Sequence, residues 1–240
     1  MFKRYGERLI EACRDAAHAL RLDGGRPGNR DQSGACRARP QIHAEERQDP
    51  GAGAGGAREL LDGIDIESVV GLRDRALIGL MVYSFARVGA VLGMRGEDFF
   101  VQGRRGWVRL HEKGGKLHEM PTHHNLDHYL ESYIAAAGIA GDRKGPLFRT
   151  TRARGGELTD RAMLQSDVWR MIRRRTAGVG IKTEIGCHSF RATGITAYLK
   201  NGGKLEIAQQ MAHHESARTT GLYDRRSDEI SLDEVERIGI

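Results

Sequence analysis

Apolar residues recur at helical spacing over most of the chain beyond residue 58. Residues three or four positions apart share one face of a helix, and two such sets predict consecutive helices: Leu72, Ala76, Leu80 and Tyr83, then Val88, Val91 and Leu92. Further helices are predicted over about 124–137, 160–177, 189–200 and 205–212, followed by one that contains Tyr223 and one opened by Ser231-x-x-Glu234. This is the pattern of a packed, mostly helical domain.

Two short segments alternate apolar and polar residues instead. The sequences WVRLH (107–111) and LHEMP (117–121) predict antiparallel strands, joined by the turn Glu-Lys-Gly-Gly-Lys at 112–116. The predicted fold class is therefore mainly α with a small antiparallel β-sheet.

Residues 1–57 have a different composition. Residues 1–22 predict a short amphipathic helix, whereas residues 23–57 hold three of the five prolines, the run GAGAGG and almost no large apolar residues. Such a segment buries too little surface to offset the entropy lost on ordering. We expect a flexible segment over 1–57 and one folded domain over 58–240.

Charge and cysteine content restrict the class of protein. The formal net charge of +6 favours an acidic partner such as nucleic acid. Cys13, Cys36 and Cys187 are far apart, which argues against a disulfide framework and a structural zinc site. The most apolar stretch, residues 76–86, is too short to cross a bilayer, and the first twenty residues lack the uncharged core that is typical of a signal peptide. The sequence predicts a cytoplasmic protein without membrane contact.

Two pairs of residues could address one phosphate. His188 and Arg191 are three apart, which places them on one helix face; chance also produces this spacing. His214 and Tyr223 are nine apart and would point in opposite directions on an unbroken helix of about 3.6 residues per turn. Ser216 can cap a new helix between them, which would let both reach the same group. The alternative is a tyrosine packed by its ring and a histidine that caps a helix.

Two further basic elements have both functional and structural interpretations. The turn Lys113-Gly114-Gly115-Lys116 would project lysines toward a bound phosphate, or simply form a solvated hairpin tip. Arg87 follows the apolar helix, where its burial is costly unless it meets an anion.

These motifs together resemble the phage-integrase family of tyrosine recombinases. In order and spacing, the resemblance rests on Arg87, the Lys113 hairpin, His188-x-x-Arg191, and His214 followed by Tyr223. The segment EKGGKLHEMP resembles the family's lysine hairpin, HSFRATGITAYL its His-x-x-Arg helix, and HESARTTGLYDRR its His-to-nucleophile segment. The match runs from about residue 62 to 231 and implies the family's helical DNA breaking-rejoining catalytic domain.

The resemblance also implies a mechanism for DNA integration or recombination, as in phages and mobile elements. Tyr223 would attack a DNA phosphate, giving a 3′-phosphotyrosyl link and a free 5′-hydroxyl, and a partner strand's 5′-hydroxyl would reverse the step. His188 fits the role of proton acceptor and Lys113 that of acid, with Lys116 as competitor. Arg87, Arg191 and His214 would stabilise charge on the phosphate. No cofactor or metal is implied.

Double-stranded DNA is the implied partner, and several arginines are candidate backbone contacts. In the helix predicted over 160–177, we expect Trp169 and Ile172 to face the core and Arg170, Arg173 and Arg174 to face solvent. Arg218 is a further candidate. The alternative is a solvated helix face without a ligand.

The sequence departs from the family in three places near these motifs. Ala90 stands where the family has an acidic residue three positions after its first arginine, so Arg87 is expected to have another partner. Phe85-Ala86 replaces the glycine common before that arginine, and His213 replaces another frequent glycine.

The largest departure is the N-terminal segment. Residues 1–60 are too short and too poor in apolar residues for the family's core-binding domain, which suggests a truncated or rearranged integrase. A helix over 232–238 is expected to dock on a neighbouring protomer of a DNA-bound homotetramer. Two alternatives remain open: a catalytically silent DNA-binding remnant, and a type IB topoisomerase-like relaxing enzyme.

Overall fold

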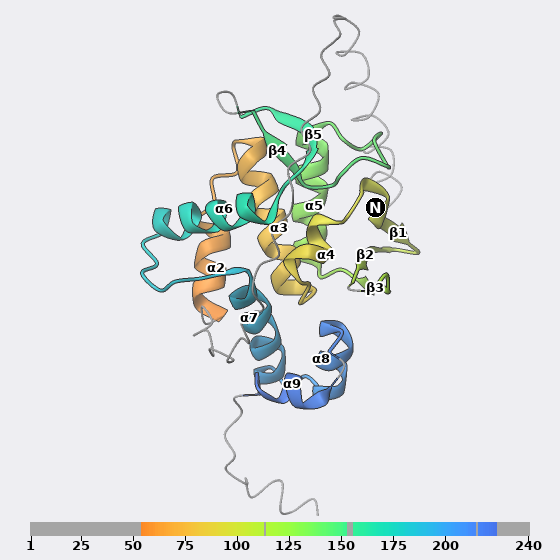
Figure 1. Ribbon diagram of the computed structural model, residues 1–240, viewed down its shortest axis with the longest axis vertical. Helices are drawn as coiled ribbons and strands as arrows, with labels where there is room; N and C mark the ends of the chain where they lie inside the picture. Colours follow the sequence, from red (N-terminus) through yellow and green to blue (C-terminus); the bar gives the residue numbers. More distant parts are fainter. Residues whose placement is uncertain (1–53, 113, 153–155, 215, 225–240) are drawn as a thin grey trace, which may run out of the picture. The chain divides into compact units, whose positions relative to one another are not determined.

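The computed structural model describes residues 54–112, 114–152, 156–214 and 216–224, and within them the chain is mostly helical with two small antiparallel sheets (Figure 1). The helices are α2 (Ala54–Asp62), α3 (Val69–Tyr83), α4 (Val88–Leu92), the 3-10 turn η1 (Gly96–Asp98), α5 (His124–Ala137), α6 (Gln165–Gly178), α7 (Cys187–Lys200), α8 (Leu205–Ala212) and α9 (Ala217–Gly221). The predicted fold class is confirmed. Helix α2 begins within the segment expected to be flexible, four residues before residue 58.

Helix α3 is the central element, packed against α2, α4, α5 and α7. Ser68 caps its start by accepting a hydrogen bond from the Gly71 N–H, 3.1 Å away. Apolar residues occur all around this helix, which is the pattern of a helix buried on every side. Its residues Leu77, Ile78, Leu80 and Met81 are fully buried.

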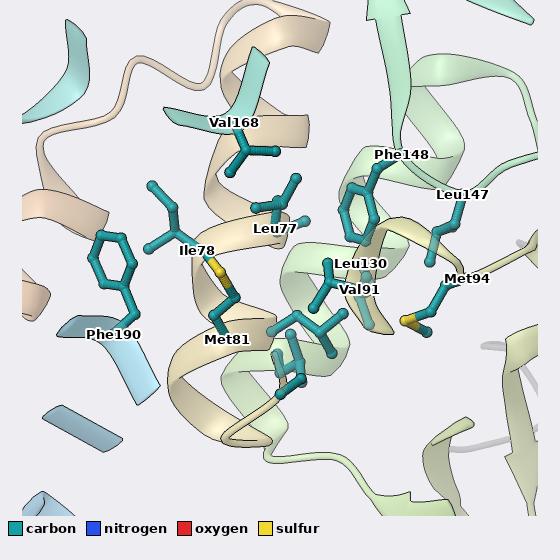
Figure 2. Packing of buried hydrophobic residues seen from close by; sticks show 14 of the residues in the cluster. Leu77, Ile78, Met81, Val91, Met94, Leu130, Leu147, Phe148, Val168 and Phe190 are labelled. Carbon is teal, nitrogen blue, oxygen red and sulfur yellow. The ribbon is translucent and has the colours of Figure 1, made fainter. Parts of the chain in front are cut away.

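Side chains from several elements close the core around α3 (Figure 2). Leu130 of α5, Val168 of α6 and Phe190 of α7 are all fully buried there. Each such apolar side chain contributes about 1.5–3 kcal/mol when removed from water. The core therefore fixes α7, which carries His188 and Arg191, against α3.

The larger sheet has the order β1-β2-β3, with strands β1 (Phe99–Gln102), β2 (Arg105–His111) and β3 (Leu117–Pro121). Val108 pairs with Phe99 on one side and Met120 on the other. The two predicted strands are confirmed as β2 and β3. The second sheet pairs β4 (Arg149–Thr151) with β5 (Leu158–Ala162) and was not predicted.

The helix predicted over 160–177 is wrong at its start. Residues 158–162 form β5, and α6 begins only at Gln165, where the Asp167 carboxylate accepts a hydrogen bond from the Leu164 N–H. The expectation that Trp169 faces the core is also wrong, because Trp169 is 51% exposed. Ile172 faces the core as expected, and Val168 and Met171 complete the buried stripe in place of Trp169.

The chain breaks between α8 and α9 as the spacing of His214 and Tyr223 required. His213 ends α8 in a left-handed conformation with φ 48°, and Ser216 caps α9 by accepting from the Arg218 N–H. The expectation that Tyr223 lies inside a helix is wrong. Helix α9 ends at Gly221, and Tyr223 follows it.

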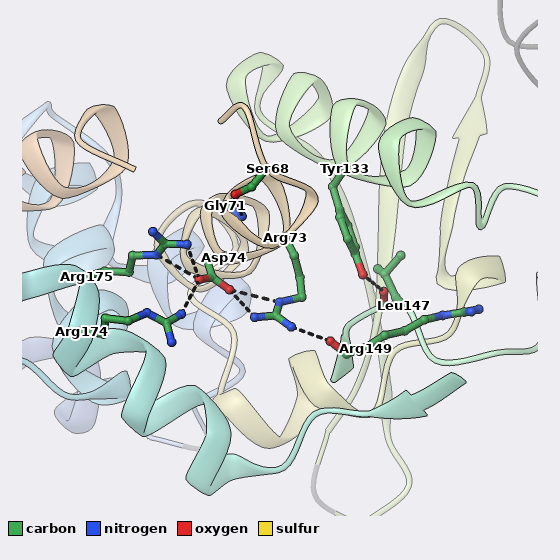
Figure 3. A network of polar contacts seen from close by, with 9 residues as sticks. All are labelled: Ser68, Gly71, Arg73, Asp74, Tyr133, Leu147, Arg149, Arg174 and Arg175. Carbon is green, nitrogen blue, oxygen red and sulfur yellow. Dashed lines mark hydrogen bonds and ion pairs between the residues drawn. The ribbon is translucent and has the colours of Figure 1, made fainter. Parts of the chain in front are cut away.

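A buried polar network ties α6 to α3 (Figure 3). Asp74 of α3 is fully buried and accepts hydrogen bonds from Arg73, Arg174 and Arg175, at 2.7–3.2 Å. Arg174 faces solvent as expected, with its side chain 60% exposed, and its guanidinium also donates to Asp74. Nearby, the Tyr133 hydroxyl donates to the Leu147 carbonyl at 2.9 Å, and burial raises the pKa of Tyr133 to about 12.

Candidate active site

Residues from four separate elements line a pocket of about 390 Å³. Gln165 of α6 lines it with an amide, and the turn into α4, the end of β2 and the first turns of α7 supply its charged and imidazole side chains: Arg87, His111, Glu112, His188 and Arg191. Four of these five carry or can carry positive charge, so the pocket suits an anion. Ala90 also lines it and contributes only a methyl group.

Arg87 is held by Glu112. Arg87 precedes the first residue of α4 in an extended conformation, and its Nη1 donates to Glu112 Oε2 at 2.7 Å. The Glu112 side chain is only 3% exposed, whereas that of Arg87 is 40% exposed. The expectation that Arg87 has a partner other than residue 90 is confirmed. Nothing in the sequence pattern singled out Glu112, which sits one position before Lys113.

Arg191 is buried on α7 and binds two backbone carbonyls. Its Nη1 donates to the carbonyl of Phe85, and its Nη2 donates to that of Ala212. Phe85 stands in the pair that replaces the family's glycine, and its φ of 54° is a conformation that glycine favours. Burial, and then the charge of Arg87, lower the pKa of Arg191 to about 10, so it remains a cation at neutral pH.

His188 lies in the first turn of α7 and is exposed on the pocket side. Gly186 precedes the helix, and its N–H donates to the Ser189 hydroxyl at 3.1 Å. Backbone N–H groups at a helix start attract negative charge. The structure thus brings His188, Arg191 and Arg87 together around one pocket.

His214 follows the left-handed residue His213 and lies beside the arginines. Its Nδ1 is 2.9 Å from the Thr220 hydroxyl. Burial lowers the pKa of His214 to about 4, and the positive charges of Arg191 and Arg87 act in the same direction. The ring is therefore neutral at pH 7 when no anion is bound.

Tyr223 packs against His214. The two rings are stacked, with centroids 6.0 Å apart and planes 13° apart. The Thr196 hydroxyl of α7 donates to the Tyr223 carbonyl at 3.2 Å. Tyr223 also packs on a small buried cluster formed by Phe85, Ile195, Leu199, Ala208 and Ala212. Tyr223 is also close enough to Arg191 to influence its pKa.

The lysine hairpin is tight, as its glycines require. Gly114 and Gly115 have φ values of 82° and 74°, and the Glu112 N–H donates to the Lys116 carbonyl at 2.8 Å. Lys116 is exposed. Lys113 lies outside the described residues, so its role stays a prediction.

The candidate DNA-contacting arginines lie outside the pocket. Arg170 pairs with Asp167 at 2.6 Å, and the Arg173 guanidinium lies 5.0 Å from the centroid of the Trp169 ring. Arg218 is exposed on α9. Exposure leaves these side chains accessible to a phosphate backbone, but the geometry does not bring them to the pocket.

Neither a metal-binding cluster nor a membrane-spanning helix occurs in the described part of the chain. No group of three histidine, cysteine, aspartate or glutamate side chains is placed to hold a metal ion there. Over the same residues, no helix combines the length and apolar character needed to cross a membrane.

A helical domain with a small sheet, a lysine hairpin and a cationic pocket beside a tyrosine has the fold of tyrosine recombinase catalytic domains. Comparison with known proteins agrees: the chain belongs to the phage integrase family, whose model matches residues 57–229.

The relatives and solved structures are distant. Tyrosine recombinase XerD of Mycobacterium leprae (strain TN) is 27% identical over 157 residues, covering 63% of this chain and 48% of that protein. XerC of Nitrobacter winogradskyi is 28% identical over 171 residues, covering 71% and 51%. The chain spans about half the length of the curated relatives it matches.

Two solved structures show the same fold. XerH recombinase bound to palindromic difH substrate superposes with a TM-score of 0.60 at 19% identity, covering 75% of this chain and 51% of that one. A lambda integrase (75–356) dimer bound to a COC' core site gives a TM-score of 0.58 at 18% identity, covering 80% and 66%.

Proposed function

We propose that this protein is a site-specific recombinase that cleaves and rejoins DNA through a phosphotyrosyl intermediate on Tyr223. The observation that carries the proposal is the convergence of Arg87, His188 and Arg191 on one pocket, with His214 and Tyr223 packed beside it. These residues come from the α3–α4 turn, α7 and the segment around α9. A shared anionic substrate explains why separate elements bring positive charge to one place.

The residue types suit attack on a phosphodiester. A phenol has a pKa near 10 and needs a proton acceptor to act as a nucleophile at neutral pH. His188, exposed at the pocket, serves as that acceptor. Arg87 and Arg191 stabilise negative charge on the non-bridging oxygens, and His214 donates a further hydrogen bond from its ring N–H, which a neutral imidazole also carries.

The leaving 5′-oxygen takes a proton from Lys113, with Lys116 as the second candidate. The phosphotyrosyl ester conserves the energy of the broken bond, so a 5′-hydroxyl of another strand can reseal the DNA without a cofactor. We propose that residues 58–240 form this catalytic domain and act on DNA in the cytoplasm. The DNA-bound structures of XerH and lambda integrase support double-stranded DNA as the partner.

Assembly belongs to the same proposal. Strand exchange requires two DNA sites and therefore several protomers, and we propose a homotetramer joined through residues 232–238. These residues lie outside the described part of the chain. Arg170, Arg173, Arg174 and Arg218 would then position the duplex through its phosphates.

A covalent adduct is the decisive test. The full chain is incubated with nicked suicide substrates made from a pool of genomic fragments, and protein-linked DNA is recovered under denaturing conditions. The proposal expects an adduct at Tyr223 that is lost in Tyr223→Phe. Salt-sensitive DNA binding without any adduct would instead show a silent binding protein. Relaxation of supercoiled plasmid by single protomers, without joining of two sites, would show a topoisomerase-like enzyme.

A further inference from the structure

Glu112 is a buried carboxylate that faces the same pocket as the proposed reacting groups. It directly follows β2, and its side chain is 3% exposed. A carboxylate buried to this degree is costly unless it is paired. Its partner is Arg87, whose Nη1 lies 2.7 Å from Glu112 Oε2.

The chain has no acid at the position where the family usually has one. Residue 90, in α4, is a buried alanine that lines the pocket. Among the pocket-lining residues in the described part of the chain, Glu112 is the one carboxylate. The negative charge in the pocket therefore comes from Glu112, at the end of β2, and not from a residue of α4.

We infer that Glu112 is a positioning residue that holds the Arg87 guanidinium in place for the phosphate, in the role that an acid at position 90 would otherwise fill. The inference rests on the proposed function. The hydrogen bond uses one of the five N–H groups of the guanidinium, so others stay available to an anion. A fixed, planar donor in place before the reaction stabilises developing charge better than a mobile one.

The carboxylate also separates two like charges. Arg87 lowers the pKa of Arg191, whereas Glu112 raises it. Two arginines aimed at one small pocket repel each other until an anion arrives. Glu112 offsets that repulsion in the free protein, which keeps both cations at the pocket.

Glu112→Gln is the main test, because it preserves shape and removes the charge. Glu119→Gln is the matched control: Glu119 accepts from Arg109 at 2.7 Å on the same sheet but is solvent-exposed. The measurements are the single-turnover rate of phosphotyrosyl formation, the dissociation constant for the same DNA, and the urea midpoint of unfolding. Removing a hydrogen-bond donor that contacts the oxyanion directly costs about 100–1000-fold in rate. Glu112 only positions such a donor, Arg87, so Glu112→Gln should lower the rate by about 10–100-fold.

Two further variants show whether Glu112 acts through Arg87. In an Arg87→Ala background, Glu112→Gln should lower the rate no further, because the contact it supports is already gone. Ala90→Glu combined with Glu112→Gln should restore most of the rate, since residue 90 lies one turn from Arg87. A purely structural role predicts neither result.

The outcomes distinguish a failure of the positioning role of Glu112 from a failure of the proposed recombinase function. An unchanged rate in Glu112→Gln, or a loss no larger than that of Glu119→Gln, would overturn the positioning role while leaving the recombinase intact. If Glu112→Gln unfolds, the Ala90→Glu double variant decides: a folded protein with restored adduct supports the role, and a folded protein without adduct overturns it. If the wild type forms no adduct at Tyr223, the proposed function fails and the inference falls with it.

Discussion

The ring of Tyr223 stacks on that of His214, with centroids 6.0 Å apart, although the two residues belong to segments separated by α9. The left-handed His213 ends α8 just before His214, and Ser216 caps the new helix α9 that leads to Tyr223. His214 is half-buried there, next to Arg191 and Arg87. Protonation of His214 should therefore disturb the packing around Tyr223, the proposed nucleophile.

Acid should destabilise the protein through His214. Its pKa is about 4 in the folded protein and about 6.5 when exposed in the unfolded chain. Between these values the unfolded state binds more protons, so the free energy of unfolding falls as pH drops from 7 to 4. Because the ring is only half-buried, screening limits the contribution to about 1–2 kcal/mol. Urea unfolding at several pH values measures it.

His214→Gln isolates this contribution from that of the carboxylates. The stability advantage of the wild type over His214→Gln should shrink from pH 7 to pH 4. His128→Gln, at an exposed position of α5, is the matched control in which an imidazole is lost from the surface. Parallel profiles for the wild type and His214→Gln would contradict the lowered pKa.

Arg191 should contribute to folding as well as to the proposed chemistry. In Arg191→Lys the ammonium cannot reproduce the planar fork that binds the carbonyls of Phe85 and Ala212. A buried carbonyl left without its donor costs about 1–3 kcal/mol, so the free energy of unfolding should fall by at least that amount. His188→Ala, at an exposed position of the same helix, should unfold at the wild-type urea concentration. Equal midpoints for the two variants would show that the two carbonyl bonds are dispensable.

Gly194 allows α7 to lie close to the end of α3. A methyl group added there would overlap the Val82 carbonyl oxygen and lie 2.8 Å from Phe85 Cδ1. Gly194→Ala should therefore lower the free energy of unfolding by about 2–3 kcal/mol, as overpacking does. Gly178→Ala, at a helix end with no atom within 4 Å of the new methyl group, is the control and should be neutral or slightly stabilising. Thermal unfolding of both variants makes the comparison.

Local pattern was sufficient to predict the elements that carry the motifs. The helices at 124–137 and 205–212 and the strands at 107–111 and 117–121 are confirmed, because a single periodicity and clear glycine signals mark each of them. The order of the four motifs was likewise enough to indicate the family. Local pattern failed for β4 and β5, whose residues gain strand structure only by pairing with each other.

The sequence pattern could not predict which side chains pair with each other across the fold. Glu112 and Arg87 are 25 residues apart, and only the folded sheet brings them together. The same holds for Asp74, which meets Arg174 and Arg175 across 100 and 101 residues. Trp169 was misplaced because Val168 and Trp169 both fit an apolar stripe, and only the packing of α6 on the core decides between them.

The Asp74 network should be the most sensitive polar site outside the pocket. Asp74→Ala leaves Arg73, itself buried, without its carboxylate and releases Arg174 and Arg175 from α3. Removing one partner of a buried ion pair costs about 3–5 kcal/mol, and this loss should appear in the urea midpoint. Asp62→Ala removes an exposed pair with Arg58 at 3.7 Å and should leave the midpoint unchanged. If Asp74→Ala were as stable as Asp62→Ala, the three arginines would not depend on that carboxylate, and the attachment of α6 to α3 would have to come from apolar packing alone.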